Sequence, residues 1–196
     1  MRYTCIEFET NGFPVKTGKY TDWTLPFSSC PIQVSVDLVN EEGEVSHAYD
    51  TVIVGATSLA YWVKQNVPVR LDDIARGRAF EDVVGDLAQI LQPGDTIVAH
   101  NASFDLELVL ARTARRLGID APELHKLLQP PRFCTLRCAY TKGGVFGARG
   151  TQLKNPCAHF EVQLQNAHDA TADSAALAQC VAEALRRGVM VQSTAH

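Results

Sequence analysis

Hydrophobic and polar positions divide the chain into a strand-rich first part and an alternating second part. Apolar and polar residues alternate over 32–38, which is typical of a strand with one face toward a core, and 3–9 and 45–53 are also predicted to be strands. The turn sequence Asn-Glu-Glu-Gly at 40–43 separates the second and third runs and predicts an antiparallel hairpin. Three strands are therefore expected before the first long helix.

Helical spacing dominates after these strands. It predicts helices at 58–65, 80–91, 103–117 and 170–187. A short apolar strand is expected at 96–99, and Asn101 or Ser103 is the expected cap of the helix that follows it. Strands first and then alternating helices and strands predict a mixed α/β sheet.

Length and composition favour one ordinary folded domain. The chain has 196 residues, of which 46% are hydrophobic and 20% charged. We expect the domain to cover 1–188 and the last residues, 189–196, to form a tail. No apolar run approaches the roughly 20 residues of a membrane span, and the first residues lack the order of a signal peptide, so an intracellular protein of the cytoplasm or nucleus is expected.

The charge balance restricts how the protein could bind nucleic acid. Lysine and arginine number 18 and aspartate and glutamate 22, which gives a formal charge of −4. A protein with this balance does not hold polyanions by bulk positive charge, so any contact with nucleic acid must be local.

The six cysteines are too few for a disulfide scaffold and are expected to be free thiols. One alternative is a zinc site, because Cys134 and Cys138 lie one helical turn apart and Cys157 and His159 follow about twenty residues later. The spacing of neither pair is typical of a zinc knuckle, and apolar residues nearby favour core positions.

Several carboxylates stand at positions where an isolated charge is unfavourable. Glu7 and Glu9 share one face of the first strand, about 6.5 to 7 Å apart, where like charges repel unless one is protonated or a cation lies between them. Asp173 lies on the apolar stripe of the last helix, and Asp105 lies in the first turn of an earlier one. An edge strand in water or a helix dipole could explain each acid singly.

The sequence around these acids changes the interpretation. The segments EFETNG at 7–12, HNASFD at 100–105 and HDATAD at 168–173 resemble, in order and separation, the three signatures of the DEDD superfamily of 3′-to-5′ exonucleases. His168, five residues before Asp173, resembles the histidine-containing (DEDDh, DnaQ-like) branch. The resemblance implies a ribonuclease H-like fold, with a five-stranded mixed sheet flanked by helices and a central first strand.

The resemblance also implies a metal-dependent 3′-to-5′ exonuclease that releases nucleoside 5′-monophosphates. Two divalent cations, Mg²⁺ or Mn²⁺, would be held by Glu7, Glu9, Asp105 and Asp173, with Glu7 bridging both. His168 would act as the general base that takes a proton from the attacking water.

By the same resemblance, the substrate would be a single-stranded or frayed 3′ end. DNA is slightly favoured over RNA, but the motifs do not fix the pocket shape on which discrimination of the 2′-hydroxyl depends. Phe13 would press against the terminal base, and basic residues of the glycine-rich loop (Lys142, Arg149 and Lys154) could contact phosphates. The complete set expected to bind substrate is Thr10, Asn11, Gly12, Phe13, His100, Asn101 and Phe104. Whether the protein forms a homodimer or joins a polymerase stays open.

One position departs from the family pattern, because Glu7 stands where such enzymes usually carry aspartate. The longer side chain shifts a bound metal unless the backbone retreats. An alternative function is therefore a weakly active module that binds 3′ ends. On the sequence alone, Glu7→Asp is expected to raise turnover or to shift the preferred ion from Mn²⁺ toward Mg²⁺.

Overall fold

A computed structural model describes residues 1–12, 15–17, 20–22, 29–119, 121–138 and 152–188. The expected tail, 189–196, and three residues expected to contact nucleic acid (Phe13, Lys142 and Arg149) lie outside these ranges. Among the described helices, none combines the length and the apolar character that a membrane span requires.

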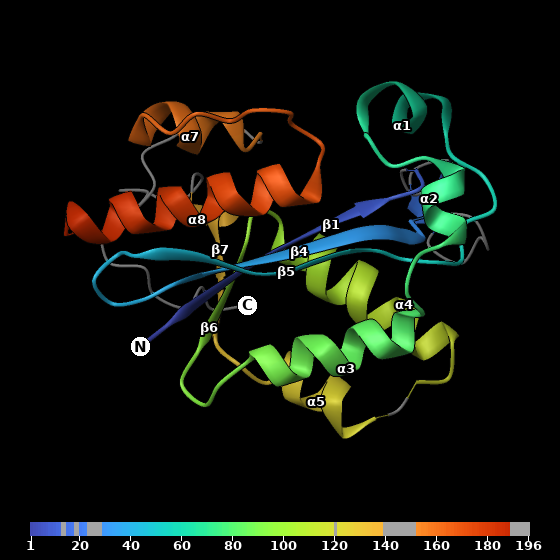
Figure 1. Cartoon of the computed structure of the whole chain (residues 1–196), viewed down its shortest axis with the longest axis horizontal. Coiled ribbons are helices and arrows are strands. Elements are labelled where there is room, and N and C mark those ends of the chain that lie inside the picture. The colour runs from blue at the N-terminus through green and yellow to red at the C-terminus, as the bar shows by residue number, and fades with distance from the viewer. Residues whose placement is uncertain (13–14, 18–19, 23–28, 120, 139–151, 189–196) are drawn as a thin grey trace.

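A five-stranded sheet with its first strand in the middle organises the molecule (Figure 1). Its strands, in the order β5-β4-β1-β6-β7, are Val45–Val52, Pro31–Val39, Tyr3–Thr10, Thr96–Ala99 and Arg132–Cys134. Strand β1 pairs antiparallel with β4 and parallel with β6, so the sheet is mixed, as the sequence predicts. A separate small hairpin joins β2 (Val15–Thr17) to β3 (Tyr20–Asp22).

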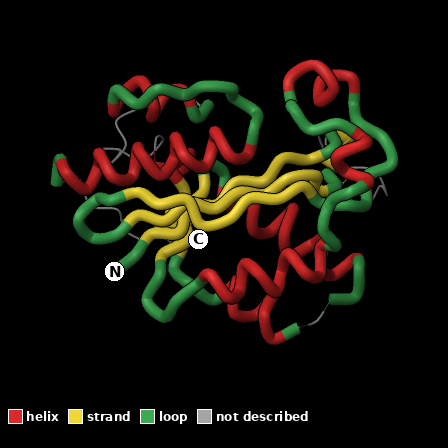
Figure 2. Tube along the Cα trace, viewed as in Figure 1, coloured by secondary structure: helices red, strands yellow, loops and turns green. Residues whose placement is uncertain are grey.

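Helices cover both faces of the sheet (Figure 2). On one face lie α7 (Lys154–Phe160) and α8 (Ala170–Arg186), and on the other lie α3 (Phe80–Ile90) and α5 (Pro122–Leu128). The other helices are α1 (Tyr61–Asn66), α2 (Leu71–Ala75), η1 (Ser103–Ala111), α4 (Arg112–Arg116) and α6 (Thr135–Cys138).

Alternation along β1 divides the core into two layers. Ile6 and Phe8 pack with α3 and η1, whereas Tyr3 and Cys5 pack with α8. Since successive side chains point to opposite faces, Glu7 and Glu9 share the face that α8 covers. The order of residues in β1 thus directs two carboxylates toward the last helix.

The helix after β6 differs from its predicted form. Its first part, η1, is a π-helix in which Arg112 N–H bonds to the carbonyl of Glu107. Ala102 already has helical dihedral angles (φ −51°, ψ −32°), and the carbonyl of Asn101 accepts the N–H groups of Phe104 (2.6 Å) and Asp105 (3.1 Å), so helical hydrogen bonding begins at Asn101, one of the two expected caps.

The alternative prediction, a zinc site, disagrees with the positions of the described cysteines. Cys134 packs in the core layer under α3, and Cys157 packs in the layer under α8, where its Sγ lies 3.8 Å from that of Cys180. His159 is exposed, and the side chain of Cys138 lies outside what the structure describes. Because the two described cysteines belong to opposite faces of the sheet, they do not converge on one ion.

Candidate active site

Strand β1 supplies Glu7 and Glu9, both half-buried, at the edge of a cleft. Oε1 of Glu7 accepts a hydrogen bond from the backbone N–H of His100, the first residue after β6, at 3.3 Å. The longer side chain at this position is therefore held by the neighbouring strand end.

Asp105 enters the site from η1 and is 1% exposed. The parallel pairing of β1 with β6 ends at Cys5 and Val98, and farther along β1 the N–H of Phe8 donates to Oδ1 of Asp105 at 3.1 Å. The Asp105 carboxylate thus accepts a hydrogen bond from β1, beyond the residues of β1 that pair with β6.

The start of α8 positions Asp173. Asp169 caps this helix by accepting the N–H of Thr171 at 3.2 Å. Gln33 on β4 donates to Asp169 at 2.9 Å and accepts the N–H of Ala170 at 3.2 Å, so the helix start is tied to the sheet. Because the first turn of α8 is capped and bonded to the sheet, the backbone that carries the Asp173 carboxylate is held in place.

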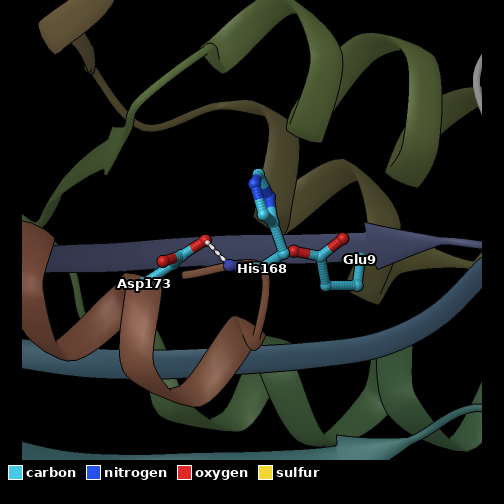
Figure 3. Close-up of side chains that lie close together, drawn as sticks. All are labelled: Glu9, His168 and Asp173. Atoms are coloured by element: carbon cyan, nitrogen blue, oxygen red, sulfur yellow. Dashed lines mark hydrogen bonds between the residues drawn. The ribbon is translucent and has the colours of Figure 1, made fainter. Parts of the chain in front are cut away.

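His168 lies in the loop before α8 with a left-handed backbone, φ 72°. Its N–H donates to Oδ2 of Asp173 at 3.1 Å (Figure 3). Ligand atoms of Glu9, His168 and Asp173 all lie within 4.8 Å of one another. The other carboxylate oxygen of Asp173, Oδ1, is buried and has no hydrogen-bond partner among the described residues. This grouping offers a divalent cation an unused oxygen and a second carboxylate.

Electrostatics in the cleft favour protonated acids when no cation is present. Burial, together with the charges of Asp173 and Asp105, raises the pKa of Glu9 to about 8. Burial raises the pKa of Asp105 to about 7 and that of Asp173 to about 6, and in both the hydrogen bonds that the carboxylate accepts oppose the rise. Burial and the neighbouring carboxylates hold the pKa of Glu7 well above its usual range. A bound divalent cation would relieve this repulsion.

The four acids and His168 line one cleft of about 580 Å³. Of the residues expected to bind substrate, those that line it are Thr10, Gly12, His100, Asn101 and Phe104. Lys154, at the start of α7, also lines it. Most of the residues that line the cleft were therefore among the candidate site residues of the sequence.

Asn11 does not line the cleft, although a contact with substrate was expected. Its side chain accepts the N–H of Cys30 at 2.9 Å and donates to the carbonyl of Ser58 at 3.3 Å. Its backbone bonds to Cys30 and Ala60. These bonds fix the chain after β1, next to the cleft residues Thr10 and Gly12.

Trp62 on α1 is a cleft residue that sequence reasoning missed. Its ring meets the imidazole of His168 edge-on, with ring centroids 4.7 Å apart and planes at 79°. Figure 1 shows α1 beyond one end of β1, far in sequence from the loop before α8. A six-residue helix with no motif gave no signal for this contact.

Comparison with known proteins identifies the family. The exonuclease family model RNase_T matches residues 35–181. This range contains Asp105, His168 and Asp173, whereas Glu7 and Glu9 precede it. No curated protein matches the chain.

Solved exonuclease structures share the fold. A structure described as 3′-end specific recognition of histone mRNA stem-loop by 3′-exonuclease is 13% identical, with a TM-score of 0.75, and the alignment covers 98% of this chain and 84% of that chain. Cell-death related nuclease 4 is 13% identical at a TM-score of 0.75, over 98% of this chain and 66% of that chain. Exonuclease X with 5′ overhanging duplex DNA is 15% identical at 0.67, over 96% and 95%. The ribonuclease H-like fold expected from the sequence motifs is confirmed.

Proposed function

The chain belongs to the RNase_T exonuclease family, and from this premise we propose that it is a metal-dependent 3′-to-5′ exonuclease releasing nucleoside 5′-monophosphates. One observation carries the proposal. Glu9, His168 and Asp173 bring ligand atoms within 4.8 Å of one another, and Glu7 and Asp105 line the same cleft. Carboxylates from β1, η1 and α8 therefore converge in one cleft. There they would bind divalent cations, which supply the positive charge that phosphodiester hydrolysis requires.

The residues present fit divalent cations. Oδ1 of Asp173 is buried without a partner among the described residues, and burial raises the pKa of all four acids. Carboxylate oxygens are the ligands that Mg²⁺ and Mn²⁺ prefer. Glu7, Glu9, Asp105 and Asp173 would hold two such ions. When bound, the ions neutralise phosphodiester charge and lower the pKa of water.

His168 is proposed as the general base. Partial burial of the imidazole lowers its pKa, so the ring is neutral and able to accept a proton near pH 7. The edge-on contact with Trp62 orients the ring, and the bond from its N–H to Asp173 fixes its backbone. These two contacts would keep the proton acceptor beside the attacking water.

The rest of the cleft would bind the 3′ end. Phe104 and Trp62 offer apolar surface for sugar and base, and Asn101 and His100 offer polar groups beside the carboxylates. Because the carboxylates lie inside a cleft, a terminal nucleotide must leave its duplex to reach them. We therefore propose single-stranded or frayed ends as the substrate, with DNA slightly ahead of RNA.

A 5′-labelled oligonucleotide tests the proposal, in matched DNA and RNA forms and in single- and double-stranded forms. With Mg²⁺ or Mn²⁺ we expect a ladder that shortens from the 3′ end, and chromatography should detect nucleoside 5′-monophosphates. Asp173→Asn is the matched control, since it keeps the side-chain shape and removes the charge. Full activity in the presence of a chelator would contradict the proposal, as would internal cleavage.

The departure at Glu7 motivates a second candidate, a module that binds 3′ ends and turns over poorly. The same oligonucleotide distinguishes the two functions. A binding module would retain the labelled strand in a mobility-shift assay and leave its length unchanged over the time course.

A further inference from the structure

A buried carboxylate outside the cleft connects the sheet to the catalytic end of α8. Asp37 on β4 is 3% exposed. Its Oδ2 accepts the hydroxyl of Ser174 on α8 at 2.5 Å, and its Oδ1 lies 3.2 Å from Nδ1 of His47 on β5. The other ring nitrogen of His47 lies 3.0 Å from Oδ1 of Asp50. A continuous chain of hydrogen bonds therefore runs from the exposed edge strand to the last helix.

A β-bulge places His47 in this chain. Val36 pairs with Tyr49, but the next residue, Asp37, pairs with His47, so Ala48 is an extra residue on β5. A bulge of this kind redirects the side chains beside it. Here it puts the imidazole next to Asp37.

Ser174 connects this chain to the cleft because it immediately follows Asp173. It is 0% exposed, and its hydroxyl lies closest to Oδ2 of Asp37, with Oγ of Ser35 at 2.8 Å and the carbonyl of Thr171 at 3.2 Å. We assign the single hydroxyl hydrogen to Asp37, because this contact is the shortest and a carboxylate is the strongest acceptor of the three. Ser174 and Asp173 lie in the same first turns of α8. A shift of Ser174 would therefore move the carboxylate of Asp173.

We propose that His47 is a positioning residue for the catalytic end of α8, acting through Asp37 and Ser174 on Asp173. The inference rests on the proposed function of the cleft. A buried carboxylate is unfavourable without a charged or hydrogen-bonding partner, and the imidazole supplies that partner at the solvent side. Without the imidazole, Oδ1 of Asp37 loses its partner, and the carboxylate is no longer held in the position from which Oδ2 accepts the hydroxyl of Ser174.

The charges around His47 agree with this role. Burial lowers the pKa of His47, but its hydrogen bond to Asp50 and its bond and attraction to Asp37 outweigh that effect, and the pKa is raised. Helix α8 also packs on β5, and its charged Arg186 donates to the carbonyl of Gly43, about 18 Å along the helix from Ser174. The imidazole is therefore held between two carboxylates.

His47→Ala tests the proposal in the full chain by hydrogen exchange and by calorimetry with Mn²⁺. We expect amides of 168–174 to exchange faster and those of 178–186 to stay unchanged. We expect Mn²⁺ affinity to fall about tenfold, at the low end of the range for outer-shell partners of metal ligands. His159→Ala, at an exposed histidine on α7, is the matched control.

A rescue variant distinguishes positioning from general stability. In Asp37→Asn/His47→Ala the amide oxygen can still accept from Ser174 and needs no cation, so exchange and Mn²⁺ affinity should return toward the wild-type values. Faster exchange throughout α8, or no rescue, would overturn the inference. If the wild-type protein binds no Mn²⁺, the proposed metal site fails, whereas the exchange pattern still decides the role of His47.

Discussion

The N–H of Phe8 donates to Oδ1 of Asp105 at 3.1 Å, so one proposed metal ligand also completes the hydrogen bonding of the central strand. Asp173 differs, because the N–H that it accepts belongs to His168, an exposed residue. Removing either carboxylate should stop catalysis, but only the removal of Asp105 leaves a buried donor unpaired.

Asp105→Ala should therefore unfold more easily than Asp105→Asn, although both should abolish hydrolysis. An unpaired buried donor costs about 1–3 kcal/mol, and the asparagine carbonyl keeps the acceptor for Phe8. Denaturant titrations of the two variants measure the difference. Equal free energies of unfolding for both variants would show that this bond adds nothing to stability.

Without divalent ions, the protein should lose stability as the pH rises. The pKa of Glu9 is raised to about 8 and that of Asp173 to about 6 in the folded chain. A group with a raised folded pKa stabilises the fold below its unfolded pKa, and this contribution disappears as the pH rises through the folded value. Melting temperatures should therefore fall between about pH 4 and about pH 8, and Mn²⁺ should raise them most at the alkaline end.

Glu9→Gln is the control for this dependence, since the amide does not titrate. The variant should show a flatter pH profile and a smaller gain from Mn²⁺. A wild-type melting temperature that rises over the same interval would contradict the assigned direction of the pKa shifts.

Alternation along β1 and β4 predicted the centre of the sheet, because each has one face rich in buried apolar residues, whereas β5 has no buried residue and was predicted from the turn before it. The three residues of β7 are too few for a periodic signal. The burial of the polar residues in β4 could not be predicted from their pattern. Gln33, Ser35 and Asp37 alternate with apolar residues, as on a strand with one solvent-exposed face, yet all three are buried. Only the packing of α8 on β4 shows that these residues hold the helix that carries Asp173.

The candidate site could be predicted where short motifs carry it. Its acids and His168 come from three short sequence motifs, at 7–12, 100–105 and 168–173. Trp62 and His47 belong to no motif, and their contacts depend on how α1 and the bulged β5 pack. Contacts made by tertiary packing alone leave no local pattern.

His168→Ala should lower the hydrolysis rate by roughly 10²-fold to 10⁴-fold, the usual effect of losing a general base. The imidazole accepts a proton only when neutral, and burial lowers its pKa, so the wild-type rate should fall on the acidic side of that pKa. The variant should lose this limb, with binding of the 3′ end little changed. An unchanged pH–rate profile would show that His168 is not the base.

Glu7→Asp should lower activity with both Mg²⁺ and Mn²⁺, contrary to the expectation from the family pattern alone. Oε1 of Glu7 accepts the N–H of His100 at 3.3 Å, and a side chain one methylene shorter draws back from that donor. Hydrogen bonds that orient a metal-binding carboxylate typically contribute about 10-fold to 100-fold to metal affinity, so a loss of about this size is expected. Glu7→Gln, which keeps the reach and removes the charge, separates length from charge in the same calorimetric titration. Higher turnover of Glu7→Asp with Mg²⁺ would instead show that the bond to His100 does not hold this side chain in the metal-loaded protein.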